Sequence, residues 1–205
     1  MPALSRLATA VTALALIAAP AGIARAADLE PAAQTIDGFD QALLATMKQG
    51  AALGVKGRFH KIEPAVARAF DLKSMARFAV GPAWAKFSDA DQALVTDAFG
   101  RLSAASYAHN FDSYDGERFE VDPAVDTRGV DKIVKTTLTP GSGAPVALNY
   151  RMRNTTGSWK AIDVFFKGTI SQLTTRRSDL AAISATGDAK AIAANLNAQA
   201  DKLLK

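Results

Sequence analysis

The feature that most constrains the fold is a change of hydrophobic period near Gly116. Before this glycine, apolar residues recur every three or four positions, which places them on one face of a helix. After it, apolar and polar residues alternate, as they do along a strand with one buried face. Helical spacing returns from about Ile170. The order of helices, strands and helices predicts an α+β domain whose helices pack on one face of a twisted antiparallel sheet.

The helical spacing predicts six helices. They are a helix from residue 31 to about 53, one carrying Ile62, Val66 and Phe70, a short one through Met75 and Phe78, one from Ser88 to about Ala108, one carrying Ile170, Leu173, Leu180 and Ile183, and a last one after Asp188. Gly50, Gly54 and Gly57 break the first pattern, and we place His60 in a basic loop that follows them.

Four strands are expected after the helices. They cover Phe119 to Val121, Ile133 to Leu138, Val146 to Met152 and Trp159 to Phe166. The last two connections are short and rich in Gly, Ser and Asn, which favours an antiparallel meander. In the third strand Val146, Leu148, Tyr150 and Met152 share the dry face, and Asn149, Arg151 and Arg153 share the wet face. Alternation in the fourth strand places Ile162, Val164 and Phe166 on one face and Ala161 on the other.

The N-terminus has the pattern of a secretory signal peptide. Arg6 precedes an uncharged, mostly apolar run of 13 residues, from Leu7 to Ala19, and an Ala-Arg-Ala sequence ends at Ala26. Because a spanning helix needs about 20 apolar residues, this run is too short for a typical membrane anchor. We expect residues 1–26 to be cleaved and residues 27–205 to form one exported domain, in the periplasm if the source is a Gram-negative bacterium.

The composition excludes several kinds of chemistry. The chain has no Cys and two His, so thiol catalysis, iron–sulfur ligation and cysteine zinc sites are absent. Its formal charge is +4, which would fall to +2 without Arg6 and Arg25, and no basic stripe for nucleic acid is present. We find no catalytic motif, and we expect no metal and no cofactor.

Asp163 is the acidic residue that stands out, because it lies between Ile162 and Val164 in the most apolar strand. A buried carboxylate needs a partner. Asp163 could be a general base, with Tyr150 beside it in an enzyme, or it could form an ion pair. We favour an ion pair with Arg176 or Arg177.

Large apolar side chains are abundant where the helices and the sheet should converge. They are Phe70, Met75, Phe78, Trp84, Phe99, Leu102, Tyr107, Leu148, Tyr150, Met152, Val164 and Phe166. Periodicity alone leaves two interpretations open: these side chains fill a core, or they line a ligand cavity.

A resemblance to a known family favours the cavity. It rests on Phe70-Asp71-Leu72-Lys73-Ser74-Met75-Ala76-Arg77, on Gly81, Trp84, Phe99, Tyr107-Ala108, Tyr114 and Gly116, and on Trp159-Lys160, Ile162-Asp163-Val164, Gly168, Ser171 and Arg177-Ser178. These residues resemble the signature of the MlaC family, the periplasmic phospholipid-binding proteins also called toluene-tolerance auxiliary components. Gly168 to Asp179 is most similar to the HpnM branch, which is associated with hopanoid biosynthesis.

The resemblance implies a periplasmic lipid carrier with an NTF2-like general shape and an internal hydrophobic pocket. It would hold a phospholipid or a hopanoid among the twelve side chains above and exchange it with a membrane complex of the MCE or a related type. We expect a monomer with no enzymatic activity. Two other classes remain open at this point: an adaptor or structural protein with a closed core, and an enzyme that acts on lipids.

Overall fold

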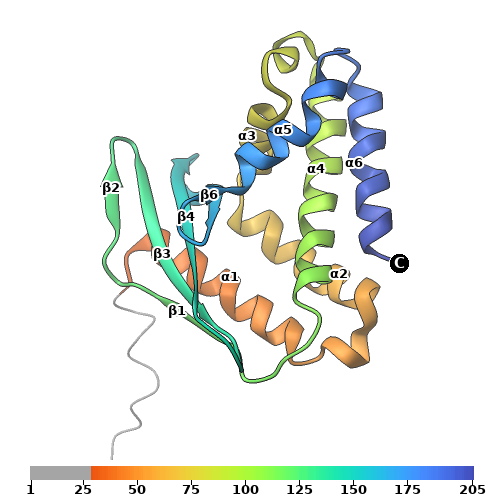
Figure 1. The fold of residues 1–205 in the computed structure, drawn as a ribbon. Coiled ribbons are helices and arrows are strands. Elements are labelled where there is room, and N and C mark those ends of the chain that lie inside the picture. The colour runs from red at the N-terminus through yellow and green to blue at the C-terminus, as the bar shows by residue number, and fades with distance from the viewer. Residues whose placement is uncertain (1–28) are drawn as a thin grey trace, which may run out of the picture.

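The computed structural model describes residues 29–205 and consists of a helical part beside one antiparallel sheet (Figure 1). The expected signal peptide lies outside the described residues. The helices are α1 (Pro31–Met47), α2 (Gly50–Ala69), α3 (Leu72–Val80), the 3-10 helix η1 (Gly81–Lys86), α4 (Asp89–Asn110), α5 (Gln172–Ser184) and α6 (Ala189–Leu203). The strands are β1 (Arg118–Val121), β2 (Asp126–Arg128), β3 (Asp131–Thr139), β4 (Val146–Thr155), β5 (Ser158–Phe166) and β6 (Ile170–Ser171).

The α+β class and the antiparallel meander are confirmed. The sheet runs in the order β1, β3, β4, β5, β6, and β2 pairs with β3. The four expected strands are β1, β3, β4 and β5. The short strands β2 and β6 were not predicted, because two or three residues are too few to show an alternating pattern. Ile170, which the sequence assigned to a helix, lies in β6 and is half exposed.

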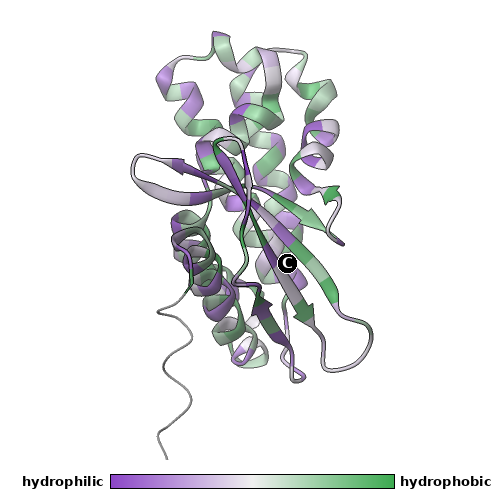
Figure 2. Ribbon diagram, turned by 90° about the vertical axis from the view of Figure 1, so that its left-hand side faces the viewer, coloured by the Kyte–Doolittle hydropathy of each residue, from purple (hydrophilic) through white to green (hydrophobic). Residues whose placement is uncertain are grey.

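The predicted inner face of β4 is confirmed. Leu148, Tyr150 and Met152 are buried on the helical side, whereas Ala147 and Arg151 are exposed. In Figure 2, which views the molecule from the sheet side, hydrophobic and hydrophilic residues are interleaved along the strands.

The predicted alternation of β5 is wrong at one point. Tyr150 pairs with Val164 and Arg151 pairs with Asp163, but Met152 pairs with Ala161, so the register shifts and Ile162 is the extra residue. Ala161 is therefore fully buried on the same face as Met152, and Ile162 lies outside the main hydrophobic cluster. A bulge reverses the alternation beyond it, which a strict period of two cannot anticipate.

The boundary between the first two helices also differs from the prediction. Helix α1 ends at Met47, and α2 already begins at Gly50. Gly54 kinks α2 with a φ of 60°, a conformation that glycine adopts without steric cost. Arg58 is buried, and it donates hydrogen bonds to the carbonyl oxygens of Gly50 at 2.9 Å and Ala108 at 2.8 Å. The residues expected in a basic loop are thus helical, and Arg58 joins the kinked helix to the end of α4.

The helices form two groups. Helix α1 packs on β1, β3 and β5, while α4 packs on α2, α3 and α6 rather than closely on the sheet. In Figure 1, α6 lies on the far side of α4 from the sheet, and α5 crosses between the end of the sheet and the top of α4. This arrangement leaves space between α4 and the inner face of β4 and β5. Within residues 29–205, no helix is both long and apolar enough to cross a membrane.

An ion-pair cluster stabilises the outer face of the sheet and yields a prediction. Asp131 is buried, and it accepts hydrogen bonds from Arg153 Nε and Arg151 Nε at 2.6 Å each. Arg153 foremost, then Arg151, holds the pKa of Asp131 below its usual value. A lowered folded-state pKa stabilises the protein at neutral pH, and this contribution is lost as the pH falls below about 3.9 and through the folded-state value.

We therefore expect Asp131→Asn to lower the free energy of unfolding by about 2 kcal/mol at pH 7, the scale of a hydrogen bond to a charged group. The loss should shrink as the pH falls below about 4. Urea unfolding at several pH values measures both. Asp97→Asn, which changes an exposed acid on α4, is the control. An equal loss at pH 3 and pH 7 would contradict the electrostatic cause.

Candidate functional site

A cavity of about 480 Å³ lies between α4 and the inner face of the sheet. Its volume is within the range of about 300 to 1,000 Å³ that is common for ligand pockets. The lining residues are Leu43, Phe70, Met75, Phe99, Ser103, Ser106, Tyr107, Asn110, Phe111, Leu138, Val146, Leu148, Tyr150, Val164, Phe166, Gln172, Leu173, Thr175, Arg176 and Asp179. They come from α1, α3, α4, α5 and the strands β3, β4 and β5, so the cavity exists only in the folded chain.

Eight of the twelve side chains proposed from the sequence line this cavity. They are Phe70, Met75, Phe99, Tyr107, Leu148, Tyr150, Val164 and Phe166. All four from the sheet lie on its inner face, as the pairings of Leu148 with Phe166 and of Tyr150 with Val164 show.

The other four proposed residues, Phe78, Trp84, Leu102 and Met152, do not line this cavity. Leu102 and Met152 are packed in the core, with 2% and 0% of their surface exposed. Met152 faces inward, but it lies past the bulge, opposite Ala161. Phe78 is 44% exposed, with the Arg177 guanidinium 5.1 Å from its ring. Trp84 is buried beside Phe87 at the edge of a separate groove. Periodicity identifies an apolar face but not which part of it reaches a void.

Several lining residues were missed by the sequence reasoning. Leu43 lies within the first predicted helix and Leu173 is a predicted apolar helix position, but neither was assigned to the site. Phe111 directly follows α4, and its ring stacks on Tyr107 at 6.0 Å. The polar residues of α5 carry no hydrophobic signal, so only the position of the helix shows that they border the cavity.

An aromatic cluster forms the closed end of the cavity. Phe39 contacts Phe70 and Tyr107 edge to face, with ring centres 5.1 and 4.9 Å apart. Phe70 also lies 6.4 Å from Tyr150. Phe39, Phe70 and Tyr150 are almost fully buried. Edge-to-face pairs favour a fixed geometry, so the cluster gives this end of the cavity a rigid apolar wall.

Asp40 is a buried acid next to this cluster. Only 2% of it is exposed, and within residues 29–205 neither of its carboxylate oxygens has a hydrogen-bond partner. Burial, with a smaller contribution from Asp37, raises the pKa of Asp40 well above its usual value. Burial also raises the pKa values of Tyr107 and Tyr150, and the nearby charge of Asp40 adds to both. Burial therefore favours the neutral form of a carboxyl group that lies behind the apolar wall of the cavity.

The cavity opens toward α5. Exposure rises from the closed end to this side: Tyr150 is 1% exposed, whereas Phe166, at the mouth, is 39% exposed. The polar lining residues are Ser103, Ser106 and Asn110 from α4 and Gln172, Thr175, Arg176 and Asp179 from α5, and the exposed ones among them are Asn110, Gln172, Thr175 and Asp179. An apolar interior with a polar mouth suits an amphipathic ligand.

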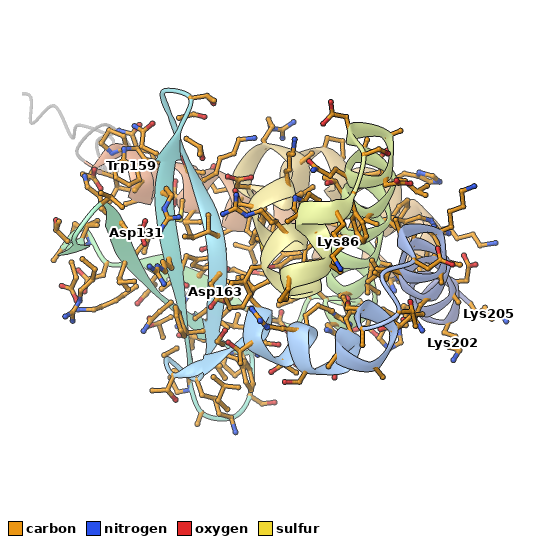
Figure 3. The ribbon with its side chains drawn as sticks, turned by 90° about the horizontal axis from the view of Figure 1, so that it is seen from above. Lys86, Asp131, Trp159, Asp163, Lys202 and Lys205 are labelled. Atoms are coloured by element: carbon orange, nitrogen blue, oxygen red, sulfur yellow. The ribbon has the colours of Figure 1, made fainter. Side chains whose placement is uncertain are left out.

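Asp163 anchors the helix that forms this mouth, which corrects the predicted ion pair. Its carboxylate accepts hydrogen bonds from the hydroxyl of Ser171 at 2.6 Å and from the amide of Leu173 at 3.1 Å. Figure 3 shows Asp163 where β5 meets α5. Arg176 instead contacts Asp179, and Arg177 donates to the carbonyl of Phe78 at 3.4 Å. A carboxylate next to a helix N-terminus is satisfied by amides, so it needs no arginine.

Within the described part of the chain, no group of three His, Asp or Glu side chains is placed to hold a metal ion. His60 and His109 are both exposed, on α2 and α4. Asp163 and Tyr150 lie on opposite faces of the sheet, as their pairings with Arg151 and Val164 indicate, so they form no joint site.

Comparison with known proteins adds the family. A family model described as MlaC protein matches residues 38–198, which is most of the chain. The chain belongs to the MlaC family. A search of curated proteins gives no match.

The fold of this chain is also similar to that of a solved structure. The chain is similar to a phospholipid-binding protein from Ralstonia solanacearum, whose structure was solved in complex with a phospholipid. The two share 22% sequence identity with a TM-score of 0.72, and the match covers 86% of this chain and 100% of the other. This likeness supports the α+β fold described above.

The raised pKa of Asp40 predicts how the stability of the protein changes with pH. Because the folded state raises the pKa of Asp40, the charged form is penalised, and the penalty grows as the pH rises through about 3.9 toward the folded-state value. Asp40→Asn, which stays neutral, should therefore gain stability relative to the unmodified chain between pH 3.5 and pH 8. Thermal unfolding across this range measures the gain. Asp97→Asn, an exposed acid on α4, should show none. A relative loss on raising the pH would show that Asp40 is ionised and partnered.

Proposed function

We propose that this protein is a periplasmic lipid carrier that binds a phospholipid with its acyl portion in the cavity and its headgroup at the α5 mouth. The observation that carries this proposal is the polarity gradient of the cavity. Aromatic and aliphatic side chains line the closed end, and the polar residues gather where the cavity opens. Membership of the MlaC family and the phospholipid complex of the Ralstonia solanacearum protein support it.

The energetics of such a carrier allow both loading and release. Moving hydrocarbon from water into the cavity is worth about 0.8 kcal/mol per CH₂ group, so a lipid would not leave into water on its own. Exchange with a bilayer or with another apolar groove is different, because hydrocarbon then moves from one apolar environment to another. A docking partner that offers a continuous apolar path would thus make transfer reversible.

The finer features of the proposal come from the sequence. The N-terminal secretory pattern supports export to the periplasm, and the Gly168–Asp179 segment supports a hopanoid as the alternative cargo of the same cavity. The family resemblance supports a membrane complex of the MCE or a related type as the docking partner. We propose a monomer that carries its ligand without chemical change and requires neither nucleotide nor metal.

The first experiment asks whether the chain carries a lipid. Protein purified from its own host should show a near-stoichiometric lipid adduct by native mass spectrometry. Organic extraction should identify the adduct as a phospholipid or a hopanoid. The apo protein recovered from several mild preparations, together with no thermal shift on adding either lipid, would contradict the proposal. Release of a modified lipid during incubation would indicate an enzyme instead.

A second experiment places the ligand in the cavity. Leu148 lines the cavity, so in Leu148→Trp the added ring should occupy ligand space and abolish lipid co-purification while the apo fold survives. The matched control is Met152→Trp, four residues along β4 on the same face but in the packed core, which should lose about 1 to 3 kcal/mol of stability. Equal destabilisation of both variants would show that the region around Leu148 is also a filled core.

A further inference from the structure

Two charged residues stand at the mouth of an otherwise uncharged cavity. Among the described residues that line it, Arg176 and Asp179 are the charged ones, and both come from α5. They lie one helical turn apart, with the guanidinium Nη1 3.7 Å from the carboxylate Oδ2. At this distance the pair is too long for a hydrogen bond. Both groups therefore retain capacity for another partner.

Arg176 is also held by a hydrogen bond to α6. Its Nη1 donates to Oε1 of Gln199 on α6 at 3.0 Å, and the Gln199 amide nitrogen in turn donates to Asn195 at 2.7 Å. Within residues 29–205, Nε and Nη2 of Arg176 have no hydrogen-bond partner. The side chain is 27% exposed. A pre-positioned guanidinium with two free donors is suited to binding a phosphate.

The environment of the two charges differs. Burial lowers the pKa of Arg176, because its guanidinium has given up part of its hydration to the cavity wall. An anion bound to the guanidinium would replace the hydrogen bonds to water that Arg176 loses on burial. Asp179 is the more exposed of the two, with 50% of its side chain accessible. The cation is thus the more buried member of the pair, and the anion is the more hydrated one.

The neighbouring Arg177 has a different environment, although it is adjacent in sequence and carries the same charge. It points away from the cavity, toward Phe78 and Gly81, and it packs over the Phe78 ring. It is therefore a matched control for any effect of positive charge on α5.

We propose that Arg176 and Asp179 form a headgroup site for a zwitterionic phospholipid. The free donors of Arg176 bind the phosphate, and the carboxylate of Asp179 pairs with the ammonium group that extends toward solvent. The more buried charge is the cation and the more exposed one is the anion, which matches a lipid whose phosphate lies nearer its acyl chains than its amine does. The inference rests on the proposed lipid-carrier function and specifies its ligand class.

The test is a competition among three lipids with identical acyl chains. Delipidated protein is loaded from neutral detergent micelles with phosphatidylethanolamine, phosphatidylglycerol and diacylglycerol in equal amounts, and the bound lipids are counted by native mass spectrometry. The unmodified chain should prefer phosphatidylethanolamine, then phosphatidylglycerol, then diacylglycerol. Arg176→Gln should lose the preference for both phospholipids over diacylglycerol by about tenfold or more, as expected for charge-assisted hydrogen bonds.

Two further variants separate the parts of the site. Asp179→Asn should abolish the preference for phosphatidylethanolamine over phosphatidylglycerol while leaving both above diacylglycerol. Arg177→Gln should bind all three lipids as the unmodified chain does. Far-ultraviolet circular dichroism and bound diacylglycerol confirm that each variant retains the fold and the cavity. Arg176→Lys, which keeps the charge on a smaller donor, should restore part of the phospholipid preference.

The outcomes distinguish the headgroup site from the carrier function. Equal binding of all three lipids by the unmodified chain, or equal effects of Arg176→Gln and Arg177→Gln, would overturn the headgroup site and leave the carrier function standing. A preference for phosphatidylglycerol over phosphatidylethanolamine would overturn the role of Asp179. If the unmodified chain binds none of the three lipids, the phospholipid-carrier function fails and the site fails with it.

Discussion

The position of α5 depends on one carboxylate. Asp163, next to the bulge of β5, accepts hydrogen bonds from the Ser171 hydroxyl and the Leu173 amide and so fixes where the helix begins. Because α5 starts there, it crosses the end of the sheet instead of lying flat on it (Figure 1). Its polar residues then border the mouth, and Leu173 reaches the interior. Helix α5 packs on β5 and on α3, so it joins the sheet to the helical layer beside the cavity.

The packing of the other helices also maintains the cavity. Helix α1 packs directly on the sheet and brings Phe39 against Phe70 and Tyr107, which closes the cavity at the end away from the mouth. Helix α4 is held from behind by α6 and α2, and Arg58 joins its C-terminal end to the kink of α2. Because α4 is stabilised by other helices, it does not need to pack closely on the sheet. A wide cavity can then exist in a stable fold.

The interior is apolar but not uniformly so. Asp40, whose pKa is raised by burial, lies behind the aromatic wall near Tyr107 and Tyr150, while the charged residues that line the cavity are Arg176 and Asp179. A buried polar group without a partner costs stability, and natural proteins retain few of them. The hydrocarbon part of a lipid would contact the wall, and its polar part would remain at the mouth. This division of polarity is what an amphipathic ligand requires.

The sequence by itself determined the class of the fold and most of the inner face of the sheet. Periods of 3.6 and 2 report which side of each element is buried, so Leu148, Tyr150, Val164 and Phe166 could be placed on one face before the structure was known. Only the tertiary structure decided which buried positions reach the cavity, because Met152 and Leu102 carry the same signal as the lining residues but pack in the core. It also decided the partner of Asp163 and the position of Arg176, since both depend on a bulge and a helix start that bring distant residues together. Hydrophobic period measures burial along one element, whereas a cavity is a relation between elements.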